Sequence, residues 1–171
     1  IAILSLGDIV SSQSIRMAGD KMNSDIASYI KNKHGLVIGE HTAEKIKMEL
    51  GTALRVDDPE TMDVRGRDVA TGMPKQITVN ENEIEEALHD TLEQIVSAAV
   101  NVLETIPPEL ASDIIDRGIM LTGGTSLLKG VDQLFSARLK VPVVVSQDPL
   151  DNVAKGAGEM LERMQKTERK K

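Results

Sequence analysis

Two adjacent glycines, Gly123 and Gly124, stand in the segment RGIMLTGGTSLLKGV, between a short apolar stretch and a helical pattern. Glycine permits positive φ and lets another group approach the main chain closely. Thr125 or Ser126 can cap the helix that we expect next, and a helix N-terminus suits an anionic or polar ligand. The segment lacks both GK[S/T] and the GxGxxG spacing. By itself it is more typical of a plain strand–turn–helix connection.

A second candidate is the segment TAEKIK, in which Glu44 and Lys47 are three residues apart and share one face of a predicted helix. A carboxylate can accept hydrogen bonds from ribose hydroxyls, and the aliphatic stem of a lysine can lie along an aromatic base. The alternative is an exposed ion pair, which contributes little to stability. Taken alone, the segment favours that alternative.

A third candidate is MAGDKMN, where Gly19 and Asp20 open a further predicted helix whose first N–H groups could face a ligand. The alternative is an ordinary aspartate N-cap, which the segment favours on its own.

The histidines His34, His41 and His89 lie in separate predicted elements and lack metal-ligand spacing. The sequence has no cysteine, which excludes disulfides, thiolate metal sites and a cysteine nucleophile.

Composition and charge exclude some classes of partner. The 171 residues carry a formal net charge of −7, and the one basic run is the tail RMQKTERKK, so we expect no binding to nucleic acid. With one Tyr, one Phe and no Trp, the chain also lacks stacking platforms for single strands. Apolar runs such as VPVVV are too short to span a bilayer. The lack of cysteine is compatible with a reducing cytoplasm.

The pattern of apolar residues predicts the elements that would position these segments. IAILSL is expected to be a strand covered on both faces, with IVSSQSIRM as its antiparallel partner. Helices are predicted from Gly19 to about Lys33 and over GEHTAEKIKMELG, the second with Thr42 as N-cap and Gly51 as C-cap. MDVRGRDV and KQITV are predicted to pair through ATGMP. Because the sequence opens inside a strand pattern without Met, we expect part of the protein to precede Ile1.

The clearest helical pattern follows Asn80, which forms a capping-box pattern with Glu83. Apolar residues then repeat at helical spacing until a Pro-Pro pair. The rest predicts a short helix PELASDII, a buried strand GIMLT, a helix LLKGVDQLFSARL, a strand VPVVV and a last helix from about Asp151. The polar segment 20–83 could be an inserted lobe, and the alternation of strands and helices around it is typical of a layered α/β domain.

Taken together, these motifs closely resemble the MreB family, the bacterial actin-like rod-shape proteins that include the Mbl and MreBH types. The resemblance rests on SLGDIVSSQSIRMAGDKMNSDI, IGEHTAEKIKMELG, VRGRDVATGMPKQITV, PPELASDIIDRGIMLTGGTSLLKG and QDPLDNVAKGAG, and it covers essentially the whole chain. It implies an α/β fold of the actin-like ATPase (ribonuclease H-like) kind, in which two domains flank a nucleotide cleft.

The same resemblance implies that the chain is the second of these domains. A core subdomain is expected at 1–19 and 84–155, and a smaller inserted α+β subdomain at 20–83. A C-terminal helix with a basic tail, 156–171, would pack on the first domain.

The resemblance also implies an adenosine site. Residues of the glycine turn are carried over onto the family's adenosine motif: Gly123, Gly124, Thr125, Ser126 and Leu127. The base and ribose side of the site would be lined by Glu44, Lys45, Ile46 and Lys47. A helix that faces the cleft would begin at Gly19 and Asp20. Thr125 stands where the family usually has a third glycine, and its Cβ narrows the allowed backbone.

The function implied by the resemblance is that of an ATP-binding cytoskeletal protein. It would form filaments with itself in the cytoplasm, at the inner face of the membrane, and act with cell-shape and cell-wall synthesis proteins. Membrane contacts, phosphate loops and the carboxylates for Mg²⁺ and water are expected in the first domain. Because phosphoryl transfer needs all these groups together, the intact protein would be a slow ATPase and this chain alone inactive. The alternatives are another actin-fold ATPase, of the chaperone or sugar kinase type, and a non-enzymatic interaction module.

Overall fold

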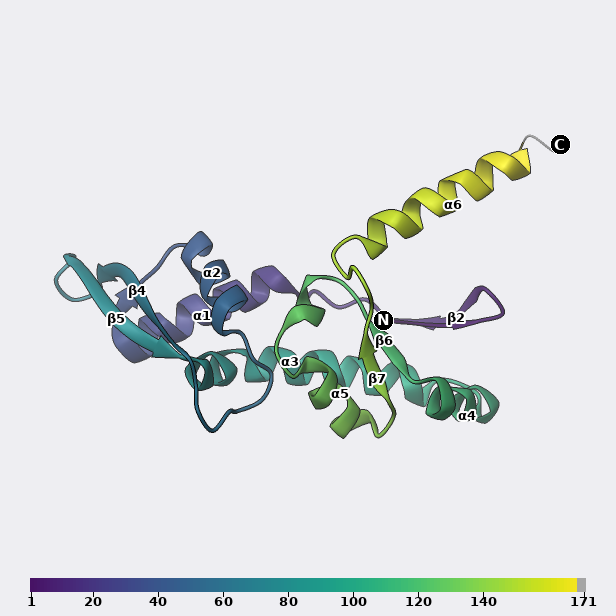
Figure 1. Ribbon diagram of the computed structural model, residues 1–171, viewed down its shortest axis with the longest axis horizontal. Coiled ribbons are helices and arrows are strands. Elements are labelled where there is room, and N and C mark those ends of the chain that lie inside the picture. The colour runs from purple at the N-terminus through teal and green to yellow at the C-terminus, as the bar shows by residue number, and fades with distance from the viewer. Residues whose placement is uncertain (169–171) are drawn as a thin grey trace.

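The fold is organised around one long helix, α3 (Glu81–Glu104), which lies across the centre of the computed structural model (Figure 1). The structure describes residues 1–168. The side chain of Asn80 accepts a hydrogen bond from the Glu83 N–H at 3.1 Å, and the Glu83 carboxylate accepts one from the Asn80 N–H at 3.1 Å. The predicted capping box is therefore confirmed, and it satisfies two of the donors that a helix start leaves unpaired.

Two helices predicted from apolar spacing pack against α3. The first, α1 (Gly19–His34), ends at Gly35, which has a left-handed φ of 63°. The second, α2 (Glu40–Leu50), has Gly39 as its N-cap, so the prediction of Thr42 is wrong. The helix begins one turn earlier than predicted because the Gly39 carbonyl already accepts the Ala43 N–H at 3.0 Å. Each helix buries the side chains of one face. These are Met22, Ile26 and Ile30 in α1, and Ala43, Ile46 and Leu50 in α2.

An antiparallel sheet of order β3–β4–β5 lies beside these helices and is formed by β3 (Leu36–Val37), β4 (Thr61–Asp68) and β5 (Pro74–Asn80). At the β4–β5 turn the Asp68 carboxylate accepts the Ala70 and Thr71 N–H groups at 3.0 and 2.9 Å. Hydrogen bonds from the Thr71 backbone, from Lys75 and from the Thr71 hydroxyl lower the pKa of Asp68 to about 2. The predicted hairpin is therefore confirmed, and its turn is tightly held.

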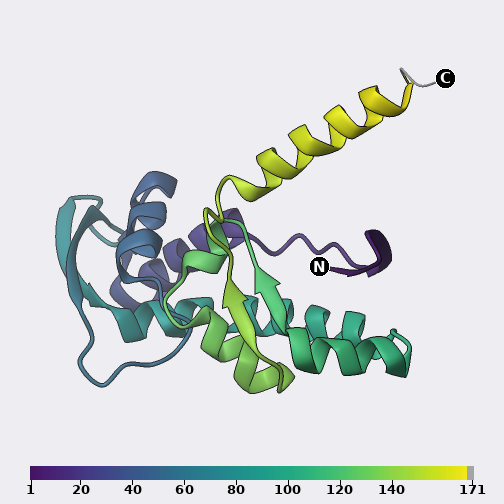
Figure 2. The same cartoon turned by 45° about the vertical axis from the view of Figure 1, so that its right-hand side comes forward.

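The remaining elements follow α3 along the chain: α4 (Pro108–Arg117), β6 (Ile119–Leu121), the 3-10 helix η1 (Gly124–Leu127), α5 (Val131–Leu139), β7 (Val143–Val145) and α6 (Asn152–Glu168). Strands β6 and β7 pair in parallel, with α5 as part of the connection between them. Figure 2 shows α6 extending away from the other elements.

The two predicted subdomains share one hydrophobic core. A single cluster of buried side chains joins α1, α2, β4 and β5 to α3 and α5. Its members are almost all aliphatic, as the scarcity of aromatic residues requires, and Phe135 is the one aromatic side chain that is buried in it. The boundaries at 19/20 and 83/84 therefore stay a prediction.

Two strand predictions are wrong about burial. Strand β1 (Ala2–Ser5) pairs with β2 (Asp8–Ser12), but Leu4 is 67 % exposed, so β1 is not covered on both faces. In β6, Met120 is 68 % exposed, although a buried strand was expected. Both strands belong to two-stranded sheets, and one face of each sheet is left without a covering layer in the described part of the chain.

We expect Asn80→Ala to lower the free energy of unfolding of the chain by about 1 kcal/mol, because the substitution removes the acceptor of the capping box. The measurement is urea denaturation followed by circular dichroism. Asn101→Ala, at an exposed position inside the same helix, is the control and should change stability by less than about 0.5 kcal/mol. Equal effects of the two substitutions would contradict a role for the cap.

Candidate functional site

The start of α1 and the EKIK segment of α2 are joined by one side chain. Lys47 is half-buried, and its Nζ donates a hydrogen bond to the Gly19 carbonyl at 3.2 Å. Lys47 does not pair with Glu44 in this arrangement, so the simple ion pair considered from the sequence is not what the structure shows. Two of the three predicted segments therefore meet.

The end of α2 is joined to the third segment through the main chain. The Lys129 N–H donates to the Gly51 carbonyl at 3.2 Å, the Ala53 N–H donates to the Lys129 carbonyl at 2.8 Å, and Thr52 forms a parallel bridge with Lys129. Gly51 is the C-cap of α2, as predicted. A Cβ at Gly51 would lie 2.6 Å from Leu128 Cδ2 and 2.2 Å from the Lys47 carbonyl oxygen, so this contact requires glycine.

The glycine turn is held by hydrogen bonds among its own residues and by one from the Gly123 N–H to the Pro149 carbonyl at 2.9 Å. Gly123 has a φ of 85°, and its carbonyl accepts the Ser126 N–H at 3.1 Å and the Ser126 hydroxyl at 2.7 Å. Neither Thr125 nor Ser126 caps an α-helix, which corrects the sequence prediction. The turn continues as η1, and the helix α5 begins only at Val131. The Ser126 hydroxyl donates to the Gly123 carbonyl and therefore does not cap a helix that follows it.

Thr125 does not distort this turn. It lies in η1 without a positive φ, so the backbone there suits a residue with a Cβ. The strict demand for glycine falls on Gly123, whose φ of 85° and ψ of 170° are accessible essentially to glycine alone. The threonine in place of a third glycine is therefore compatible with the turn.

The predicted site residues differ in what their side chains can reach. Ile46 is fully buried in the core, and Ser126 is buried in the turn, so both can act only by holding their segments in place. The side chain of Lys45 is exposed, and its Nζ lies 3.7 Å from Glu49 Oε1. The others are exposed or half-buried: Gly19, Asp20, Glu44, Lys47, Gly123, Gly124, Thr125 and Leu127.

The start of α1 lacks a side-chain cap. Its N-cap is Ala18, and Asp20 is the second residue of the helix, so the aspartate N-cap considered from the sequence is not formed. The first N–H groups of a helix are donors without an intrahelical partner. Beside them lie the Lys47 ammonium group and, three residues away on α2, the exposed Glu44 carboxylate. These groups offer donors and acceptors to a polar ligand.

No group of three or more His, Asp or Glu side chains among residues 1–168 could hold a metal ion. In the same part of the chain, no helix is both long and apolar enough to cross a membrane.

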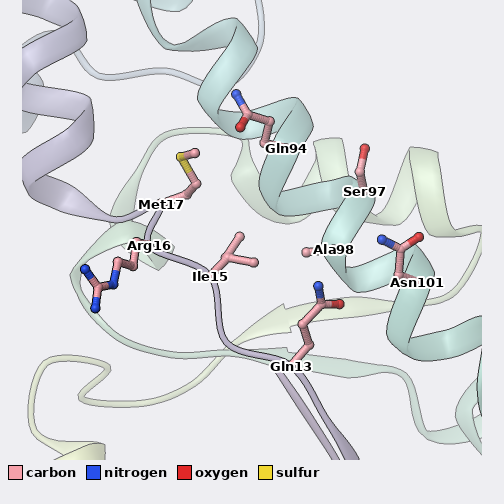
Figure 3. A pocket seen from close by; sticks show the side chains of 8 residues that line it. All are labelled: Gln13, Ile15, Arg16, Met17, Gln94, Ser97, Ala98 and Asn101. Atoms are coloured by element: carbon pink, nitrogen blue, oxygen red, sulfur yellow. The ribbon is translucent and has the colours of Figure 1, made fainter.

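A hollow of about 390 Å³ lies apart from the predicted site, between the segment 13–17 and α3 (Figure 3). Its lining combines polar and apolar side chains: Gln13, Ile15, Arg16, Met17, Gln94, Ser97, Ala98 and Asn101. None of these residues belongs to the predicted site.

Sequence reasoning missed the residues that connect the segments. Thr52 is buried and Lys129 bridges to it, but no spacing in the sequence pairs positions 77 residues apart. The leucine of LLKG that packs against Gly51 was likewise assigned only to a helix. The signal in the sequence that could have indicated this contact is the pair Gly51 and Gly130, because a glycine allows two chain segments to approach closely.

Comparison with known proteins identifies the family. The family model described as MreB/Mbl protein matches residues 1–169. This chain belongs to the MreB/Mbl family. Cell shape-determining protein Mbl of Bacillus subtilis is 52 % identical over the whole chain, which covers 51 % of that protein. Cell shape-determining protein MreB of Escherichia coli is 48 % identical over 95 % of the chain and 47 % of its own length. The chain therefore spans about half the length of these MreB/Mbl relatives.

Solved structures confirm the expected α/β actin-like fold. MreB5 of Spiroplasma citri bound to AMPPNP superposes with a TM-score of 0.93 at 33 % identity, over 99 % of this chain and 51 % of that one. The MamK double helical filament superposes with a TM-score of 0.69 at 18 % identity, over 86 % of this chain and 45 % of that one, a likeness of fold alone. The arrangement of elements in this MreB/Mbl chain is therefore that of its family.

We expect Gly123→Ala to lower the free energy of unfolding by about 1–3 kcal/mol, because alanine cannot adopt the backbone conformation of Gly123 without strain. Space is not the obstacle, since no atom lies within 4 Å of a Cβ built there. In Gly124→Ala, the matched control, the new Cβ would lie 3.4 Å from Leu150 Cδ2, and stability should change by less than about 0.5 kcal/mol. Urea denaturation tests the difference, and equal losses would contradict it.

Proposed function

We propose that this chain supplies the adenosine side of the nucleotide site in an ATP-binding cell-shape protein. The observation that carries the proposal is the physical connection of the three candidate segments through Lys47 with Gly19 and through Thr52 with Lys129. Two structures of MreB5 of Spiroplasma citri, bound to AMPPNP and to ADP, support it by similarity.

In this proposal the exposed groups of the site contact different parts of the nucleoside. Glu44 accepts hydrogen bonds from the ribose hydroxyls, and the stem of Lys47 lies along the base. The main chain of Gly123 and Gly124 faces the adenosine, because glycine leaves no side chain in the way. Gly19, Asp20, Lys45, Thr125 and Leu127 border the same surface.

Mg²⁺ would be held mainly by the part of the protein outside this chain, together with the groups that activate water. Positioning the γ-phosphate, the metal and the water is what phosphoryl transfer requires. The chain alone therefore binds nucleotide weakly and does not hydrolyse it, whereas the whole protein is a slow ATPase. The chaperone and sugar kinase alternatives lose their support, since the relatives at 52 % and 48 % identity are cell shape-determining proteins.

We further propose that the whole protein assembles into open filaments with itself. The β4–β5 turn lies at one end of the ribbon, and the β1–β2 turn and α4 lie toward the other end (Figure 1). Each of these places carries exposed apolar side chains: Val69 and Met73 at the first turn, Leu6 at the second and Ile115 on α4. A contact between unlike ends of successive copies extends without closing. Filaments in the cytoplasm, at the membrane and coupled to cell-wall synthesis proteins, are the proposed setting, supported by the relatives' role in cell shape.

For the nucleotide site, we expect Gly124→Val in the whole protein to weaken ATP binding by about tenfold or more, because the side chain occupies the surface proposed for adenosine. Calorimetric titration with ATP and Mg²⁺ measures it, with melting temperature as the check on folding. Gly39→Val is the control, since no atom lies within 4 Å of a Cβ at Gly39 and its φ is −83°. Unchanged affinity in Gly124→Val would show that the turn is only structural.

For assembly, we expect the double substitution Val69→Ser, Met73→Ser to raise the critical concentration for ATP-dependent pelleting of the whole protein by about tenfold, because apolar contact area at the tip is lost. The matched control makes the same change in composition at Met120 and Val144, which are register partners on β6 and β7. If both double variants pellet like the unaltered protein, the β4–β5 turn is not a filament contact.

A further inference from the structure

One ion pair links the loop after η1 to the beginning of α3. Lys129 Nζ lies 2.5 Å from Glu81 Oε1 and 3.4 Å from Glu60 Oε2. The Glu81 side chain is only 5 % exposed, and its other carboxylate oxygen accepts the Glu60 N–H at 3.0 Å. Each oxygen of this buried carboxylate therefore has a partner, one of them cationic.

The same lysine holds α2 through its main chain. Its N–H and carbonyl bond to Gly51 and Ala53, and the Thr52 hydroxyl approaches its carbonyl at 3.4 Å. The neighbouring Gly130 is close to Leu54, whose Cδ1 would lie 3.2 Å from a Cβ at that glycine. Lys129 therefore fixes three segments at once: the end of α2, the start of α3 and the loop that begins at η1.

Burial and charge act against each other at this pair. Burial of Glu81 favours its neutral form, but hydrogen bonds from Lys129 and from the Glu60 N–H, with the lysine charge, outweigh it and hold the pKa of Glu81 below its usual value. The hydrogen bond to Glu81 likewise raises the pKa of Lys129. Both groups are therefore charged near neutral pH. Removing the lysine would leave a buried carboxylate without its cation, which is strongly destabilising and favours a shift of the loop or of the helix start that brings the carboxylate to water.

We propose that Lys129 is a positioning residue for the nucleotide site: through Glu81 and the main chain of Gly51–Ala53 it sets the spacing between η1 and α2. The inference rests on the proposed function, since these two elements carry the groups proposed to contact adenosine. Lys129 itself does not contact the nucleotide. Because a bound ligand tolerates only small displacements of the groups that hold it, a shift of η1 relative to α2 weakens adenosine contacts specifically.

The experiment uses the whole protein and compares Lys129→Met, Glu81→Gln, their combination and Lys129→Arg. The dissociation constants of ATP and of inorganic tripolyphosphate are measured with Mg²⁺ by calorimetric titration. We expect each single neutralisation to weaken ATP binding by about tenfold and to leave tripolyphosphate binding unchanged, because the triphosphate lacks the adenosine. The double variant should be no weaker than the single ones, and Lys129→Arg should retain most of the affinity.

Lys33→Met is the matched control, because Lys33 also forms ion pairs near the start of α3, with Glu83 and Glu86. Lys33 belongs to α1, and the partners of its side chain lie in α1 and α3 and not in the loop after η1. The control should leave the ATP affinity unchanged. If Lys129→Met does not fold, Glu81→Gln decides the question, since it removes the charge and keeps the size of the native side chain. Lys129→Arg, which keeps the charge on a larger side chain, then serves as the charge-preserving comparison.

The inference is overturned if the neutralised variants lower the melting temperature but bind ATP as the unaltered protein does. It is also overturned if ATP and tripolyphosphate lose affinity equally. If the unaltered protein binds tripolyphosphate but gains nothing from the adenosine of ATP, the proposed function fails as well, which distinguishes that outcome from failure of the positioning role alone.

Discussion

The arrangement of this molecule depends on the close approach of two main-chain segments, residues 51–53 and residues 128–130. Gly51 allows it, because any side chain there would collide with Leu128 and with the Lys47 carbonyl. Once the segments are in contact, Thr52 and Lys129 bridge in parallel, and the end of α2 is fixed against the loop that leaves η1. The three segments that carry candidate ligand groups are thereby held together, although they are far apart along the chain.

Elements with strong local signals were predictable. The capping box at Asn80 and Glu83, the stripes of α1 and α2 and the β4–β5 hairpin follow from side-chain chemistry within a few residues, and local interactions decide such features. The N-cap of α2 was missed because Gly39 caps without a side-chain bond, whereas Thr42 offers the side-chain oxygen that is the stronger sequence signal for an N-cap. The exposure of β1 and β6 was missed because an apolar run shows only that a strand is suited to burial. Whether its side chains are buried depends on whether other layers pack on the strand.

The candidate site was predictable as a set of segments and not as a geometry. Composition and spacing favoured the structural alternative for each segment taken alone, and only their joint resemblance to one family linked them. The contacts that join them use backbone groups of Gly51, Ala53 and Lys129, and backbone groups are the same in every residue. For this reason no residue pattern reveals the connection. The sequence argument singled out Lys47 for the stem of its side chain, and in the structure the ammonium group of Lys47 bonds to a carbonyl of α1 and not to Glu44.

The two small sheets carry a consequence for the behaviour of the chain in solution. Strands β1 and β2 form one pair and β6 and β7 another, so in the described part of the chain every strand of these pairs has an outer edge whose N–H and C=O groups lack a strand partner. Leu4, Ile9 and Met120 add exposed apolar side chains to these strands. Such edges are templates for β-augmentation, in which an extended segment of another molecule adds itself to the sheet. Exposed edges of this kind favour strand-mediated association of the isolated chain, which differs in kind from the end-to-end assembly proposed for the whole protein.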